Sequence, residues 1–221
     1  MNNVSNRFAS SLWYAIMAIA AFGSFFALGT AVVRNGEPPA LLAWEHTLVN
    51  HSTLIAWWLT WSCYIYVLVP IAVALLIIAW LAPAWRTRIL YSIVVLLLCW
   101  RGADFFQHVF ARPRQLDWVV KHETSFSYPS SHATIATGFY ALWAVMLYCS
   151  ELPLTVRRTA GTTLALLAIA ICWSRLALGA HYLTDIIGGA LLAIALASAV
   201  QAVVPINLFA PFAGRVYRSA E

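Results

Sequence analysis

The sequence has few charged residues. Of its 221 residues only 10% are Asp, Glu, Lys or Arg, and 62% are hydrophobic. A soluble domain is typically about half apolar and about a quarter charged. This composition therefore excludes a soluble domain and predicts an integral membrane protein. We expect a single transmembrane domain over residues 1–221. The formal net charge of +5 by itself identifies no partner.

Cysteine is also scarce, and the four cysteines lie inside apolar runs without a CxxC spacing: Cys63, Cys99, Cys149 and Cys172. This pattern favours apolar packing residues over a disulfide framework. The six histidines do not pair at ligand spacing with cysteine or with one another. We therefore expect no metal site and no cofactor.

Long apolar runs take up most of the chain. The first, Leu12–Val33, has 22 residues without a charge, longer than the ~7–15 residues of a signal-peptide core, and we interpret it as a retained span. Spanning helices need ~20 mostly apolar residues, which predicts five more: Tyr64–Leu81, Ile89–Phe110, Ser131–Cys149, Ala160–Leu178 and Tyr182–Val204. The expected fold is all-α with six transmembrane helices. Because Trp is enriched at membrane interfaces, Trp57, Trp58 and Trp61 predict an interfacial helix before the second span.

The basic residues predict the orientation of the spans. With the N-terminus in the cytoplasm, the inner segments hold Arg7, Arg86, Arg88, Arg157, Arg158, Arg215 and Arg218, and the outer segments hold Arg34, Arg101, Arg112, Arg114, Lys121 and Arg175. Four of the outer arginines lie near polar clusters, where a role in a site can explain them. When these four are left out, most of the basic residues lie in the inner segments, as the positive-inside rule requires. We expect both termini in the cytoplasm and residues 101–130 and 175–185 together on the outer side.

The first polar cluster is SRLALGAHYLTD, residues 174–185. His181 and Asp185 are four residues apart and share one face of a helix. An Asp beside an imidazole holds one ring nitrogen as N–H and leaves the other as a nucleophile. The alternative is a pair that only caps a helix. Arg175 is either a functional cation at membrane depth or an arginine that snorkels to the interface.

The second cluster is YPSSHATIATG, residues 128–138, where Ser130 can cap a helix after Pro129. The N-terminus of a helix favours an anion, and His132 in the first turn has a pKa suited to a general acid. An ordinary helix start is the alternative.

The third cluster is ADFFQHVFARPRQLDW, residues 103–118. Arg112 and Arg114 present planar forks suited to phosphate oxygens, or they face lipid headgroups. Arg101 and Asp104 are expected to form an ion pair inside the bundle. Together the three clusters predict an anion site for phosphoryl transfer through a phosphohistidine.

The clusters resemble the type-2 phosphatidic acid phosphatase superfamily, which includes vanadium haloperoxidases and bacterial acid phosphatases. The family motif Ser-Arg-x5-His-x3-Asp is matched by Ser174, Arg175, His181 and Asp185. The motif Pro-Ser-Gly-His is matched by Pro129, Ser130 and His132, with Ser131 in place of Gly. In the motif Lys-x6-Arg-Pro, Arg114 matches, whereas Gln107 replaces Lys and Gln115 replaces Pro. The motif core covers about residues 101–190.

The resemblance implies a role for each matched residue. His181 is the expected nucleophile, Asp185 orients it, and His132 protonates the leaving oxygen and later activates water. Arg114 and Arg175, with the backbone N–H groups and hydroxyls of Ser130 and Ser131, are expected to bind phosphate oxygens. Gln107 is expected to donate a hydrogen bond to the phosphate without a charge. Arg112, His108 and Lys121 are auxiliary candidates.

The resemblance also implies a lipid phosphatase in a bacterial inner membrane, with its active site on the periplasmic side. Undecaprenyl diphosphate is the favoured substrate, and phosphatidylglycerol phosphate and phosphatidic acid are further candidates. The expected partners are the bilayer and the lipid substrate, and no nucleic acid. One alternative is a phosphotransferase that moves phosphate to a lipid acceptor such as lipid A. Another is a transporter or a scaffold without catalytic activity, favoured by the altered first motif.

Overall fold

The computed structural model describes residues 2–49, 53–114 and 124–204, and within these ranges all regular secondary structure is helical, as predicted. The elements are α1 (Asn2–Asn35), α2 (Pro39–Leu48), α3 (Thr53–Trp61), α4 (Ile65–Leu81), α5 (Pro83–Phe110), α6 (Ser131–Ile135), the π-helical turn η1 (Ala136–Ala141), α7 (Leu142–Tyr148), α8 (Leu154–Ala177) and α9 (Leu183–Val203). The long elements coincide with the apolar runs of the sequence.

By length and composition, four of the described helices can cross a membrane: α1 from Ser11, α5, α8 and α9. The pair α3 and α4 forms a fifth candidate with a bend of 42°. The fourth expected span falls on α6, η1 and α7, which follow one another without a break and have 5, 6 and 7 residues. The count of six spans therefore stays a prediction.

Two short helices precede α4. The Trp cluster lies on α3, which is a separate helix before the span, as expected for a lead-in. Helix α2 was not expected, because the sequence analysis placed no helix between Val33 and Ser52. Its start carries the proline at N1 that often opens a helix, a signal that was missed.

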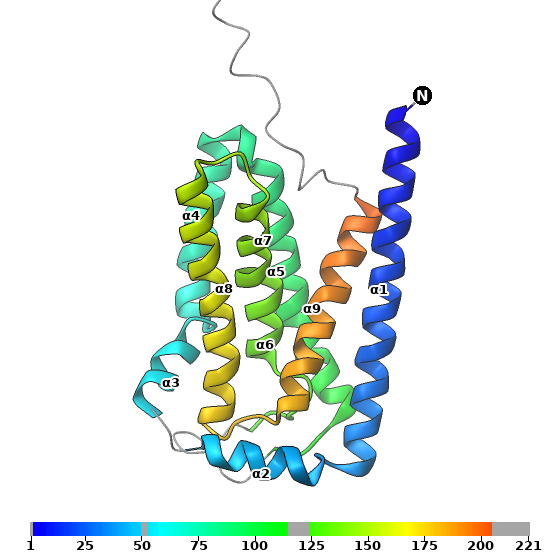
Figure 1. The fold of residues 1–221 in the computed structure, drawn as a ribbon, viewed down its shortest axis with the longest axis vertical. Coiled ribbons are helices and arrows are strands. Elements are labelled where there is room, and N and C mark those ends of the chain that lie inside the picture. Colours follow the sequence, from blue (N-terminus) through cyan, green and yellow to red (C-terminus); the bar gives the residue numbers. More distant parts are fainter. Residues whose placement is uncertain (1, 50–52, 115–123, 205–221) are drawn as a thin grey trace, which may run out of the picture.

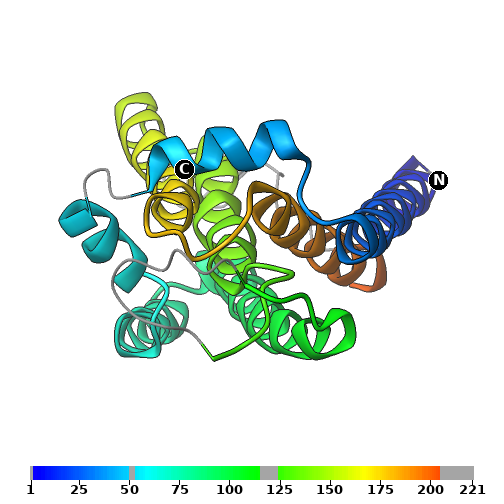
Figure 2. The same ribbon diagram turned by 90° about the horizontal axis from the view of Figure 1, so that it is seen from below.

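The helices form a bundle with one polar end. Helix α1 runs antiparallel to α9, and α4, α5, α7 and α8 stand beside this pair (Figure 1). Helix α2 lies across the end that is remote from the N-terminus, next to the start of α9 (Figures 1 and 2). The start of α6, the end of α5 and the end of α8 reach the same end, so segments far apart in the sequence meet under α2.

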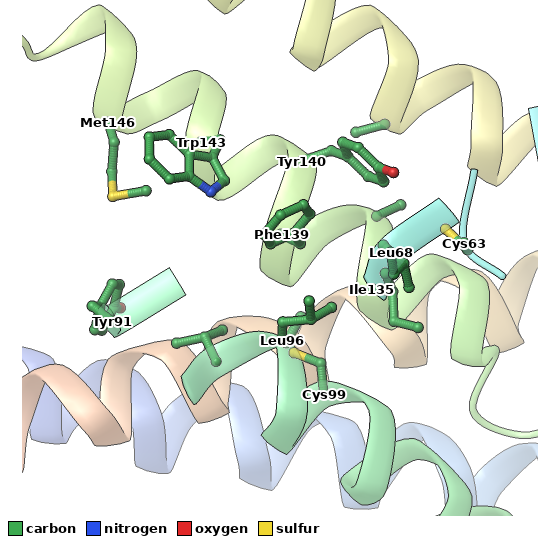
Figure 3. Close-up of a cluster of buried hydrophobic side chains, with 14 of the residues drawn as sticks. Cys63, Leu68, Tyr91, Leu96, Cys99, Ile135, Phe139, Tyr140, Trp143 and Met146 are labelled. Carbon is green, nitrogen blue, oxygen red and sulfur yellow. The ribbon is translucent and has the colours of Figure 1, made fainter. Parts of the chain in front are cut away.

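Aromatic and sulfur-containing side chains fill the main core between α4, α5, η1, α7 and α8. Phe139, Tyr140 and Trp143 belong to this core; Trp143 lies near Met146, whereas Tyr140 extends to the other side, toward Cys63 (Figure 3). Cys63 and Cys99 are buried there, as expected for packing residues, whereas Cys149 is exposed. Within the residues described, all four cysteines are free thiols.

Glycines on α9 let a second layer approach closely. A Cβ on Gly188 would come 2.3 Å from the ring of Tyr128, and a Cβ on Gly189 would come 2.7 Å from the Ser130 carbonyl oxygen. The Tyr128 ring stacks on Phe25 of α1 at 5.4 Å, and its hydroxyl donates to the Phe25 carbonyl at 2.6 Å. These contacts press the start of α6 against the start of α9, where the polar clusters meet.

We expect Gly189→Ala to lower the free energy of unfolding by about 1–3 kcal/mol, the usual cost of overpacking a tight interface. The added methyl group would meet backbone, which cannot move as a flexible side chain can. Thermal unfolding of the purified protein in detergent measures the change. Gly23→Ala is the matched control, because a Cβ there has no atom within 4 Å. Equal stability of the two variants would contradict this packing argument.

Candidate active site

His181 and Asp185 lie at the polar end of the bundle, and both side chains are buried. Asp185 is the third residue of α9 and accepts the Tyr182 backbone N–H at 3.0 Å, so it does cap the helix. The same carboxylate oxygen, Oδ2, lies 3.4 Å from His181 Nδ1. Asp185 therefore caps α9 and also lies beside the imidazole, and the nucleophilic role of the pair stays a prediction.

Arg114 lies on the other side of the imidazole. Its Nη1 is 3.0 Å from His181 Nε2 and donates to the Ala180 carbonyl at 2.8 Å. A guanidinium has only donors, so Nε2 must present its lone pair and Nδ1 must carry the proton. The Arg114 Nε also donates to the Ser125 carbonyl at 2.7 Å, which fixes the guanidinium beside the ring. The network thus defines the tautomer that the sequence predicted.

Burial and neighbouring cations disfavour protonation of His181. Burial is the largest effect and lowers the pKa of the His181 imidazole well below its usual value, and the Arg114 and Arg175 guanidinium groups lower this pKa further. Both effects disfavour a protonated ring. A neutral imidazole with a free Nε2 lone pair is the form that can attack phosphorus.

Asp185 is held from several sides. Arg112 donates to Asp185 Oδ1 at 2.6 Å, and the Ser127 hydroxyl donates to Oδ2. Arg112 also donates to Thr184 Oγ1 at 2.8 Å and to Glu37 Oε2 at 2.8 Å. Its guanidinium is therefore committed to two carboxylates. Arg112, expected as an auxiliary phosphate ligand or a surface arginine, is 3% exposed and fixes Asp185.

The sequence analysis missed two glutamates that cover the site. Glu37, just before α2, accepts from Arg112 and from the Thr184 hydroxyl. Glu45 on α2 is 1% exposed and accepts the Leu183 backbone N–H at 2.7 Å. Burial, with the neighbouring Glu37 and Asp185 charges, raises the pKa of Glu45 to about 7. The scarcity of acidic residues could have drawn attention to both glutamates, because the chain has only 8 acidic residues.

Arg175 ends α8 beneath the site. Its side chain is 1% exposed, and its Nη1 donates to Thr60 Oγ1 on α3. A snorkelling arginine would reach the surface, so that alternative is wrong. The charge of Arg175 acts on both His132 and His181. The role of Arg175 as a phosphate-binding cation stays a prediction.

The start of α6 places His132 near the same cations. Ser130 is the N-cap, and its hydroxyl accepts the Ala133 N–H at 3.4 Å. Among the described residues the buried His132 Nε2 has no hydrogen-bond partner. The charges of Arg175 and Arg114 act on this ring, and the Tyr64 ring meets it edge-on at 5.5 Å. A buried ring nitrogen without a partner is suited to a proton donor for a bound ligand.

The remaining candidates lie in different surroundings. Gln107 is buried, and its Nε2 lies 2.9 Å from the Pro129 carbonyl oxygen and 3.0 Å from Ser131 Oγ. His108 is exposed, with Nδ1 against the Asp104 carbonyl of its own helix at 2.8 Å and its ring against Phe126. Lys121 and Gln115 lie outside the described residues.

The ion pair expected between Arg101 and Asp104 inside the bundle is a wrong prediction. Both side chains are exposed on the outside of α5, and Arg101 lies over the Trp100 ring at 5.8 Å from its centroid. A helix that is packed on one side only leaves such residues on its outer face.

Comparisons with known proteins agree with the motifs. Residues 104–208 match the family model of the PAP2 superfamily, which confirms the resemblance inferred from the sequence. The fold is similar to a crystal structure described as the first transmembrane PAP2-type phosphatidylglycerolphosphate phosphatase from Bacillus subtilis. The TM-score is 0.67 and the identity 20%, over 84% of this chain and 94% of that one. A search among curated proteins found no match.

The raised pKa of Glu45 predicts a dependence of stability on pH. The folded carboxyl group binds its proton more tightly than the unfolded one, whose ordinary value is 4.5. The stabilisation by Glu45 is therefore complete below about pH 4.5 and is lost as the pH rises to about 7. Glu45→Gln keeps an acceptor for Leu183 and a donor toward Glu37 at every pH. We expect this variant to be more stable than the parent by about 1–3 kcal/mol at pH 8, and the gain to disappear near pH 4.5.

Thermal unfolding of both proteins between pH 4.5 and 8 measures the difference. Exposed Glu151, changed to Gln, is the matched control and should leave the pH dependence of stability as it is. A constant difference between Glu45→Gln and the parent across the range would contradict the assignment.

Proposed function

We propose that this PAP2-like chain is an integral membrane phosphatase that hydrolyses a lipid phosphate or diphosphate through a phosphohistidine on His181. One observation carries the proposal. The buried His181 imidazole has a carboxylate at Nδ1 and a guanidinium 3.0 Å from Nε2. A phosphoryl group held by Arg114 would meet the Nε2 lone pair directly, because both groups occupy the same small region.

In the first step, His181 Nε2 attacks phosphorus. The N–P bond forms as the bond from phosphorus to the leaving oxygen breaks, and His132 Nε2 gives its proton to that oxygen. The Arg114 N–H that faces Nε2 turns to an equatorial phosphate oxygen, and Arg175 supplies a second cation. Charge that develops on these oxygens is thereby stabilised in a site that excludes most water.

In the second step, water attacks the phosphohistidine. His132 takes a proton from the water, an O–P bond forms, and the N–P bond breaks to release inorganic phosphate and neutral His181. Asp185 stabilises the Nδ1–H tautomer and the positive charge that the ring carries while it is phosphorylated. Arg112 and Ser127 fix the direction of the Asp185 carboxylate.

The location of the site supports a lipid substrate. The polar end of the bundle lies at the ends of apolar helices, where a headgroup can enter while its tail stays in the bilayer. We favour undecaprenyl diphosphate, with phosphatidylglycerol phosphate and phosphatidic acid as further candidates. The name of the Bacillus subtilis protein makes phosphatidylglycerol phosphate a direct comparison. With a cytoplasmic N-terminus in a bacterial inner membrane, the site faces the periplasm.

We expect His181→Ala to lower the rate of phosphate release by at least about 10³-fold, because the covalent step has no replacement nucleophile. Phosphate release from a panel of lipid phosphates in detergent measures it. The control is His46→Ala, an exposed histidine on α2, which should keep the parent rate. Parent protein that releases no phosphate from any substrate would favour a transporter or scaffold. Radiolabel that moves to a second lipid would favour a phosphotransferase.

Orthovanadate should inhibit and EDTA should not. Vanadate adopts the five-coordinate geometry of the transferring phosphoryl group, and transition-state analogues bind more tightly than substrates. The proposed charge stabilisation comes from Arg114 and Arg175, so chelation of divalent ions should leave the rate within about twofold. Loss of activity in EDTA that added metal restores would refute the metal-independent mechanism.

A further inference from the structure

We infer that Gln107 is a positioning residue and that the Ser131 hydroxyl, which Gln107 orients, makes the phosphate contact. This inference rests on the proposed function and deepens it. In the sequence analysis Gln107 was expected to donate to the phosphate itself. The contacts of its amide group indicate instead that Gln107 holds Ser131 in place and does not bind the phosphate.

Both amide hydrogens of Gln107 already have acceptors. Nε2 is 2.9 Å from the Pro129 carbonyl oxygen and 3.0 Å from Ser131 Oγ. A backbone carbonyl can only accept, so the group that faces it must be the NH2 and not the amide oxygen. The side chain is 3% exposed, and the geometry fixes its orientation.

A direct contact from Gln107 to a phosphate would therefore break one of two buried hydrogen bonds. Phosphate oxygens accept hydrogen bonds, and the other polar atom of the Gln107 amide, Oε1, can also only accept. Loss of a buried partner costs more than an average hydrogen bond contributes. Gln107 is thus suited to hold the start of α6 in place and poorly suited to bind the substrate.

The Ser131 hydroxyl has a hydrogen that it can donate, whereas both amide hydrogens of Gln107 are already engaged. Its Oγ accepts from Gln107, so its own hydrogen remains for another acceptor. Ser131 is the residue before His132 and is half-buried, whereas its neighbour Ser130 is fully buried and caps the helix. A hydroxyl polarised by a donated hydrogen bond is a better donor in turn. This arrangement leaves a strengthened O–H donor on the residue next to His132.

The two departures from the motifs are therefore one feature. Gln107 replaces the motif Lys, Ser131 replaces the motif Gly, and these two residues are hydrogen-bonded to each other. A glycine at 131 would leave a Gln107 N–H without this acceptor. The pair gives the site a neutral donor in place of a charge, so Arg114 and Arg175 carry the cationic contacts.

A double-mutant cycle tests the inference with Gln107→Leu, Ser131→Ala and the combined variant. Two properties are measured. The first is vanadate binding to the purified protein, detected by calorimetry or by the inhibition that vanadate causes. The second is kcat and KM for a lipid phosphate. We expect each single change to weaken vanadate binding and to lower kcat by about 10²–10³-fold, as for the loss of one donor to a developing oxyanion. The combined variant should be no worse than Ser131→Ala alone, because both changes remove the same contact.

Two further variants separate positioning from general damage. Ser131→Thr retains a hydroxyl and should recover most of the kcat lost in Ser131→Ala. Ser92→Ala is the matched control, since Ser92 is a buried serine on the same helix, α5, and its hydroxyl bonds only the Ile89 carbonyl of that helix. This control should stay within about twofold of the parent in both assays.

Single effects that multiply in the combined variant would overturn the inference, because they would mean that Gln107 and Ser131 contact the phosphate independently. Parent protein that binds vanadate but releases no phosphate would refute the proposed function, and the vanadate cycle would still decide the role of the pair. Parent protein that fails to bind vanadate would overturn both.

Discussion

The ion pair between Arg112 and Asp185 is the contact on which the site depends. It joins the chain after α5 to the first turn of α9 at 2.6 Å and brings Glu37, before α2, into the same network. A buried ion pair stabilises a fold only when further hydrogen bonds compensate for lost hydration. Here Ser127, Thr184 and the Tyr182 backbone supply those bonds. The direction of the Asp185 carboxylate, and with it the tautomer of His181, follows from this network.

Close packing between α6 and α9 also determines the geometry of the site. Gly188 and Gly189 allow the Tyr128 ring and the Ser130 backbone to lie directly against α9. The Ser130 N–H donates to the Asp185 carbonyl at 3.0 Å, so backbone as well as side chains ties α6 to α9. His132 follows two residues later, which places it among the same cations as His181. Small residues in the interface thus bring His132 and His181 together as much as the polar contacts do.

The sequence was sufficient for whatever depends on local pattern. Apolar runs located the long helices, and the spacing of His181 and Asp185 and the cap at Ser130 were correct because a single helix turn determines them. The partners of Arg112 and Gln107 were not predictable, since tertiary packing chooses which acceptor a long side chain meets. Glu37 and Glu45 were missed because their function requires α2 to lie across the end of the bundle. The bend between α3 and α4 also depends on contacts with distant helices.

Arg112 and Arg114 are separated by one proline, and their guanidinium groups have different partners. The segment after α5 is non-helical from residue 111, where the backbone of Ala111 is left-handed with φ 47°. Arg112 turns inward to Glu37 and Asp185, whereas Arg114 reaches His181 Nε2. The first guanidinium is saturated by carboxylates and holds the framework. The second donates to the Ser125 and Ala180 carbonyls and lies 3.0 Å from His181 Nε2, so its charge would attract an anion that binds beside the imidazole.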